Sequence, residues 1–392
     1  MTQVTRPLPW PLALGLTRRR VLQMGATAAV GGPLALWRGR ALAQAKPSKL
    51  VYGNIGPAGA DDAVFQEGID LFTKASGIPV DVQLGGDAEL FQKILAWVAS
   101  NQQIDSVFVR ENFLAAFVKD DILQPIDGLA GLDQLKPQIA TLFLQSMERN
   151  GKTWGLPYYA EVETCWLYED KVKQAGIAEP PKSWDELSDV CIKAKRDGVA
   201  TYPMVWAAGQ GDHHMPWQWF TQVHSRGGRV FDDKMQPLLG EGSIARQALV
   251  WWRKTFIDWK ITDPRSVELR YIPAMKAFST GQYLFALVLF QTWLQGTQDP
   301  GSSAIAGRVR LFQMPGNGKT MAYARLHGMT STAINREWTW TLMNYLAAKT
   351  PAGDFVVPRD WSLKRGYVPA YKTLWDDPAL RAAWSKWVDF DA

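Results

Sequence analysis

The 392-residue sequence lacks the common motifs of enzymes and contains only two cysteines and four histidines. It has no G-x-S-x-G nucleophile motif, no H-E-x-x-H zinc motif and no paired C-x-x-C. The run Gly318-Lys319-Thr320 lacks the glycine that a phosphate-binding loop requires five positions before Gly318, where Gln313 stands. These absences favour a protein that is not an enzyme, and they give no reason to expect a cofactor.

The sequence also offers little for a metal ion or for glycoside hydrolysis. His213 and His214 are adjacent, so their side chains diverge on either backbone type, and no third ligand stands at metal spacing. Glu161 and Glu163 lie two apart on one predicted strand, which is a weak signal because glycosidase carboxylates must face each other across a substrate. We therefore predict neither a metal site nor catalytic residues.

The first 45 residues have the composition of an export signal. Arg18 and Arg19 form a twin-arginine motif before a glycine-rich apolar run that is too short and too weak to span a bilayer. Small residues around Ala45 suit cleavage, and no cysteine follows the run for lipid attachment. The sequence therefore predicts export by the twin-arginine translocase, giving a soluble periplasmic protein without a lipid anchor.

Removal of this leader changes the charge of the chain. The first 45 residues contain six arginines and no acidic residue, so the formal net charge changes from +5 to −1. A nearly neutral protein has no electrostatic reason to bind nucleic acid. The remaining length is sufficient for two domains, and we expect a monomer.

From residue 49 onward, strand patterns alternate with amphipathic helix patterns, which predicts an α/β fold with largely parallel sheets. The strands are expected at 49–55, 79–84, 104–109, 164–167, 202–206, 282–290, 309–314 and 323–333. The helices are expected at 61–76, 87–100, 111–119, 184–197, 215–225, 244–259, 271–279 and 337–349.

The segment from Gly151 to Glu186 carries the most specific pattern. Asn150-Gly151 predicts a hairpin turn, an aromatic-rich strand follows, and Ser183 with Glu186 forms the capping box of the next helix. Cys165 falls in this strand and Cys191 on the apolar face of that helix, so a disulfide and two buried free thiols both fit. We prefer the free thiols, because unpaired cysteine is commonly buried.

This segment resembles extracellular solute-binding proteins of sugar ABC transporters, the family that includes the maltose-binding protein. The resemblance rests on G-K-T-W-G-L-P-Y at 151–158, W-L-Y-E-D-K at 166–171, A-G-I-A-E-P-P-K-S-W-D-E-L at 175–187 and F-T-K-A-S-G-I-P-V at 72–80. It implies a two-lobed periplasmic-binding-protein fold of type II, with hinge strands between the lobes. The implied N-terminal lobe comprises 46–157 and 310–349, and the implied C-terminal lobe 158–309 and 350–392.

Aromatic residues supply the first site candidates. The sequence has 19 tryptophans, and only Trp10 and Trp37 lie in the leader. An indole ring offers a sugar a flat apolar face and one N–H donor. Trp206 and Trp293 fall at or just after the ends of predicted strands, where α/β lobes bind ligands. For both, ligand binding and core packing remain alternatives, and the resemblance favours binding.

Polar candidates follow from the same topology. The loops after the first three strands carry Asn54, Asp87, Arg110 and Glu111. The resemblance adds the hinge residues Tyr158, Tyr159 and Glu161, with Glu163 as the competing acid, and His327 beside a small-residue strand near the hinge.

The resemblance implies a function. We expect a periplasmic protein that captures a carbohydrate by hinge closure and delivers it to an ABC importer, with the permease in the inner membrane as its partner. The alternatives are the same fold binding another small solute, such as a polyol, a phosphate ester or a polyamine, and a secreted carbohydrate-active enzyme.

Overall fold

The computed structural model describes residues 45–55, 62–85, 89–209 and 214–388. The predicted leader lies outside these residues except for Ala45. Within the described part of the chain, no helix is long and apolar enough to cross a membrane.

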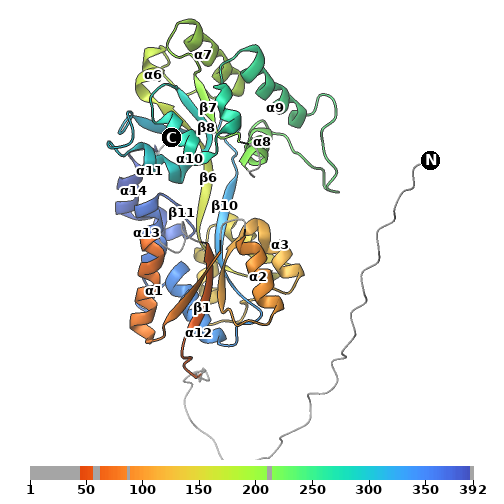
Figure 1. Cartoon of the computed structure of the whole chain (residues 1–392), viewed down its shortest axis with the longest axis vertical. Coiled ribbons are helices and arrows are strands. Elements are labelled where there is room, and N and C mark those ends of the chain that lie inside the picture. Colours follow the sequence, from red (N-terminus) through yellow and green to blue (C-terminus); the bar gives the residue numbers. More distant parts are fainter. Residues whose placement is uncertain (1–44, 56–61, 86–88, 210–213, 389–392) are drawn as a thin grey trace, which may run out of the picture. The chain divides into compact units, whose positions relative to one another are not determined.

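The first lobe begins with the predicted alternation of strands and helices. Its elements are β1 (Leu50–Ile55), α1 (Ala63–Ser76), β2 (Val80–Gly85), α2 (Leu90–Ala99), β3 (Ser106–Arg110) and α3 (Glu111–Lys119). Strand β1 pairs in parallel with both β2 and β3, as expected for strands joined by crossover helices. Figure 1 shows α1 on one side of β1 and α2 with α3 on the other.

Helix α1 has clear start and stop signals. The side chain of Asp62 accepts a hydrogen bond from the amide of Val64 at 2.8 Å, and Gly77 ends the helix in the left-handed conformation with a φ of 66°. Its buried face includes Phe72, whose ring packs edge-on against Tyr345. The local signals and the apolar spacing therefore agree on this element.

A short hairpin leads into the strand that both lobes share. Strands β4 (Glu148–Arg149) and β5 (Lys152–Thr153) pair across Asn150 and Gly151, which have φ values of 54° and 70°. Two left-handed residues in succession are the geometry of a tight hairpin turn, so this prediction is confirmed. Before it lie α4 (Leu132–Leu135) and α5 (Thr141–Met147).

Strand β6 (Leu156–Tyr168) belongs to the sheets of both lobes. Up to Val162 it pairs with β10 (Ala322–Met329), which in turn pairs with β3 of the first lobe. From Glu163 onward it pairs with β8 (Phe285–Phe290) and β9 (Val309–Phe312) of the second lobe. In Figure 1, β6 and β10 run between the two groups of elements, which matches the expected crossing strands.

The second lobe packs helices around β6, β7 (Met204–Trp206), β8 and β9. Strand β7 pairs in parallel with β8. The helices are α6 (Glu169–Gln174), α7 (Trp184–Arg196), α8 (His214–Ser225), α9 (Ile244–Arg253), α10 (Tyr271–Phe278) and α11 (Leu294–Thr297). The predicted helix 244–259 continues beyond α9 as a π-helical segment, Lys254–Asp258. The two-lobed α/β fold predicted from the sequence is thus confirmed.

The C-terminal region packs differently from the prediction, which placed 350–392 in the second lobe. Helix α13 (Val356–Arg365) contacts α1 and α12 (Arg336–Ala347), and Trp361 and Tyr371 are buried in the first-lobe core. After α14 (Pro378–Trp384), the chain reaches the second lobe, where the Trp387 carbonyl accepts a hydrogen bond from the Leu311 amide at 3.1 Å. The apolar face of α13 therefore completes the first lobe.

Both cysteines are buried and unpaired, which confirms the preferred interpretation. The sulfur of Cys165 lies 3.6 Å from that of Met314, and burial raises the pKa of the Cys165 thiol to about 12. Cys165 and Cys191 therefore act as small apolar residues in the second-lobe core.

Candidate functional site

Polar side chains, all but one of them buried, gather where β6 changes partners between the lobes. We call this group the junction cluster, and it consists of Glu111, Glu161, Glu163, Tyr271, Tyr323 and Arg325. Tyr323 interacts electrostatically with the three glutamates and with Arg325, and Tyr271 with Glu163 and Tyr323. The members come from α3, β6, α10 and β10, so the topology of both lobes brings them together.

Glu161 and Arg325 form a buried ion pair across β6 and β10, and each side chain is less than 10% exposed. Burial opposes the charge of Arg325, whereas Glu161, Tyr159 and Tyr158 favour it, and the net effect is a raised pKa. Two desolvated charges in contact satisfy each other, and removal of either partner would leave the other without compensation.

Glu163 is buried to the same degree and has hydroxyl partners in place of a cation. Its carboxyl oxygens accept hydrogen bonds from the hydroxyls of Thr221 on α8 and Tyr271 on α10, the latter at 2.8 Å. Burial raises the pKa of Glu163 to about 8, although both hydroxyl contacts act in the opposite direction. The side chain is therefore mostly neutral at pH 7.

Glu111 connects α3 to the crossing strand β10. It stands in the first turn of α3, directly after Arg110 ends β3, and its carboxylate accepts a hydrogen bond from the Ala324 amide at 2.7 Å. Burial raises the pKa of Glu111, and the Ala324 amide and Arg325 oppose this shift. The prediction correctly located these two residues at the carboxyl edge of the first-lobe sheet.

Aromatic rings adjoin the junction cluster on the side of the second lobe. Trp217 on α8 stacks on Tyr323, with ring centroids 4.0 Å apart and 28° between the planes. Tyr271 stacks on Phe290 at 4.5 Å. Sequence reasoning missed Trp217, although its place in the first turn of the helix that follows β7 was a usable signal.

The two predicted hinge tyrosines lie in aromatic stacks of the first lobe. Tyr158 stacks on His327 at 4.2 Å, and Tyr159 stacks on Tyr367 at 3.8 Å. The Nδ1 atom of His327 shares a hydrogen bond with the hydroxyl of Tyr52, and burial lowers the pKa of His327 to about 3. The imidazole is therefore neutral and packs inside the first lobe.

Four other predicted residues have different surroundings. Asn54 is buried in β1, where its side chain accepts a hydrogen bond from the Ile55 amide at 2.8 Å. Trp206 is fully buried against Trp251 and Trp252, a packing that favours the core alternative. Trp293 is half-buried directly after β8, and its indole N–H has no partner among the described residues. Asp87 lies outside the described residues.

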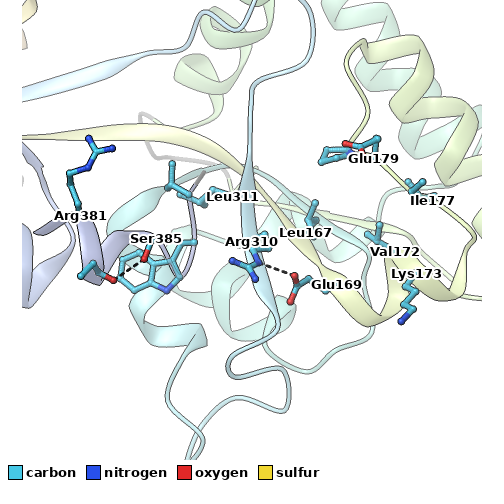
Figure 2. Close-up of a pocket in the computed structure, with 15 residues that line it drawn as sticks. Leu167, Glu169, Val172, Lys173, Ile177, Glu179, Arg310, Leu311, Arg381 and Ser385 are labelled. Atoms are coloured by element: carbon cyan, nitrogen blue, oxygen red, sulfur yellow. Dashed lines mark hydrogen bonds and ion pairs between the residues drawn. The ribbon is translucent and has the colours of Figure 1, made fainter. Parts of the chain in front are cut away.

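A separate surface pocket of about 1000 Å³ lies at the far end of β6 (Figure 2). Its walls come from α6, residues 177–180, β9 and α14, and an ion pair between Arg310 and Glu169 crosses it at 2.8 Å. None of the predicted site residues lines it. Among the described residues, no group of histidine, cysteine and acidic side chains could hold a metal ion.

Comparisons of the sequence with known proteins find a family and relatives. The family model of the bacterial extracellular solute-binding protein matches residues 56–307. A protein of Brucella abortus (strain 2308), described by its name as a binding protein, is 22% identical over 298 residues, or 72% of this chain. The match covers 66% of that relative's length.

Solved structures agree on the fold. Maltose-bound MalE3 of T. maritima superposes with a TM-score of 0.73 at 18% identity, covering 86% of this chain and 84% of the other. An ABC transporter solute-binding protein from Agrobacterium radiobacter K84, in complex with ribitol, gives 0.69 at 18% identity, covering 86% and 85%. Because the family model covers more than half of the residues and the two-lobed fold agrees with it, this chain belongs to the bacterial extracellular solute-binding protein family.

Proposed function

We propose that the protein captures a carbohydrate or a polyol in the periplasm and delivers it to the permease of an ABC importer. The single observation that carries this proposal is the junction cluster, where carboxyl, guanidinium and phenol groups lie beside stacked aromatic rings, next to the strand shared by both lobes. Carboxylates and guanidinium groups match the hydroxyls of a sugar, and aromatic faces match its C–H groups. The maltose and ribitol complexes of the similar structures support this class of ligand.

Within the proposed site, Trp217 replaces Trp206 as the stacking residue. Trp217 is half-buried and already stacks on Tyr323, whereas Trp206 is enclosed by the second-lobe core. Arg110, Glu111 and Trp293 would complete the contacts, because they lie at or just after the carboxyl ends of β3 and β8. Glu161 would act through Arg325, since its carboxylate is committed to that ion pair.

Thermal melts with maltose and with ribitol, followed by titration calorimetry, test the proposal, because a ligand that binds only the folded state raises its stability. Trp217→Ala should weaken binding by about 1–3 kcal/mol through loss of an aromatic contact. Trp259→Ala is the matched control, since this half-buried tryptophan packs on the second-lobe core away from the junction cluster. Equal loss of affinity in both variants would contradict the assignment of Trp217.

Recovery of unaltered sugar after incubation with the protein would support a transport protein. Formation of product in proportion to protein would favour the carbohydrate-active enzyme.

Export is tested separately. Replacement of Arg18 and Arg19 by lysine should leave precursor in the cytoplasm, and normal periplasmic recovery would contradict twin-arginine export.

A further inference from the structure

The strand β6 carries two buried acids with opposite electrostatic surroundings. Glu161 and Glu163 are two residues apart on the strand, and both are less than 10% exposed. Glu161 pairs with the guanidinium of Arg325, whereas Glu163 has only the hydroxyls of Thr221 and Tyr271 as described side-chain partners. A buried acid without a cation favours its neutral form, which can both donate and accept a hydrogen bond.

The two partners of Glu163 stand on the helices that border the proposed ligand site. Thr221 lies one turn after Trp217 on α8, and Tyr271 begins α10 and stacks on Phe290. A change in the charge of Glu163 therefore acts on the aromatic face formed by Trp217 and Tyr323.

The backbone of Glu163 is also fixed to the second crossing segment. Its amide donates to the carbonyl of Met321 at 3.0 Å, and its carbonyl accepts from the hydroxyl of Thr320 at 2.6 Å. Hydrogen bonds of the side chain and the backbone of Glu163 therefore link α8, α10, β6 and the segment between β9 and β10. No other member of the junction cluster joins these four segments through the hydrogen bonds of the described residues.

Among the described residues, the other titratable groups that interact with Glu163 lie on three elements. Tyr271 on α10 and Tyr323 on β10 interact with it electrostatically, as does Cys165 on β6 itself. Arg325 on β10 is committed to Glu161, and Arg270 before α10 is exposed. Burial raises the pKa of both tyrosines and of Cys165 away from neutral pH, so among these described groups Glu163 is the one whose pKa, about 8, lies near neutral pH.

We propose that Glu163 is a proton-linked positioning residue, whose neutral form holds α8 and α10 in the arrangement that binds ligand. Loss of its proton leaves a charge without a cation in a desolvated position between the two helices. The cost of burying that charge exceeds what the two hydroxyl donors return, so the charged form favours a looser arrangement of α8 and α10 with lower affinity. By linkage, ligand binding then favours uptake of one proton by Glu163 when the pH is near or above its midpoint. The statement about affinity rests on the proposed carbohydrate function.

The first arm of the test needs no ligand. The indole NMR signal of Trp217, assigned with Trp217→Phe, should titrate near pH 8 in the full mature protein and stay constant in Glu163→Gln. Tyr271→Phe removes a hydroxyl that stabilises the charged form, so the midpoint should move to higher pH. Tyr283→Phe is the matched control, because this buried second-lobe tyrosine donates to Asp263 and should leave the midpoint unchanged.

The second arm measures the Kd for maltose and for ribitol between pH 6 and 9.5. The Kd should rise toward about tenfold per pH unit above the midpoint in the native protein, and it should stay level in Glu163→Gln. A Trp217 signal that ignores pH, or that titrates equally in Glu163→Gln, overturns the proposal. A titrating signal with a level Kd overturns its affinity statement. Absence of binding at every pH counts against the proposed function, while the first arm still decides the role of Glu163.

Discussion

Burial divides the predicted site residues into some that lie at the junction cluster and others that pack inside the cores of the lobes. Asn54, Tyr158 and His327 are polar or aromatic residues near strand ends or the hinge, yet they are packed inside the first lobe. For Tyr158 the sequence neighbourhood could not reveal this, because its ring packs near Trp361 of α13, which follows about two hundred residues later in the chain. Glu111 and Arg110 were placed correctly because the carboxyl edge of a parallel sheet follows from local pattern alone.

Stability should depend on pH through Glu163. The pKa of its carboxyl is about 8 in the folded protein and about 4.5 when unperturbed, so between these values the folded state holds a proton that the unfolded chain releases. Stability therefore falls as pH rises across this window, by up to about 1.4 kcal/mol per pH unit, and is level outside it. In urea unfolding from pH 5 to 8.5, Glu163→Gln should lose this slope, and the exposed Glu179→Gln should retain it.

Trp206→Ala should destabilise the protein by about 3–5 kcal/mol, because it leaves a cavity between Trp251 and Trp252. The folded fraction should bind sugar with normal affinity. Denaturant unfolding combined with calorimetry checks both statements. A small loss of stability together with a large loss of affinity would restore Trp206 to the ligand site.

Most helices and strands could be predicted from local signals. Asp62 and Gly77 delimit α1, and Asn150 with Gly151 fixes the hairpin, because caps and left-handed turn residues act within a few positions. The lobe against which α13 packs could not be predicted in the same way. Its apolar residues Val357 and Trp361 specify a buried face, but not which lobe supplies the partner.

The packing of α13 predicts which elements lose protection from hydrogen exchange when Trp361 is replaced. Trp361→Ala should cost about 3–5 kcal/mol through a first-lobe cavity. Hydrogen exchange should increase in α1 and α12, which contact α13, before it increases in α7. Wild-type protection in α1 with loss of protection in α7 would mean that α13 supports the second lobe in solution. Trp184→Ala, in the second-lobe core, should give the reverse pattern.

At the scale of the molecule, three stretches of chain connect the lobes. They are β6, the segment between β9 and β10, and the C-terminal stretch in which Arg310 donates to the Lys386 carbonyl at 2.8 Å. If the lobes move about a hinge, hydrogen bonds of the C-terminal stretch, such as that from Arg310 to the Lys386 carbonyl, must either persist or break. We expect X-ray scattering to show a smaller radius of gyration on saturation with maltose, and an unchanged radius with proven binding would contradict hinge closure.

Because the chain passes from the first lobe into the second through β6 and returns later, the core residues of the two lobes are completed at different points of synthesis. The core of the second lobe is drawn mainly from residues 165–314, an uninterrupted stretch, whereas the first lobe begins at Leu50 and still needs residues up to Leu374. The first lobe therefore cannot complete its core until α12 and α13 have been synthesised, although its strands β1 to β3 are synthesised before the second lobe. A chain released after Ala333 should protect second-lobe amides from exchange while those of β1 to β3 remain open. Equal protection of β1 in that chain would show that the first lobe folds without its distant helices.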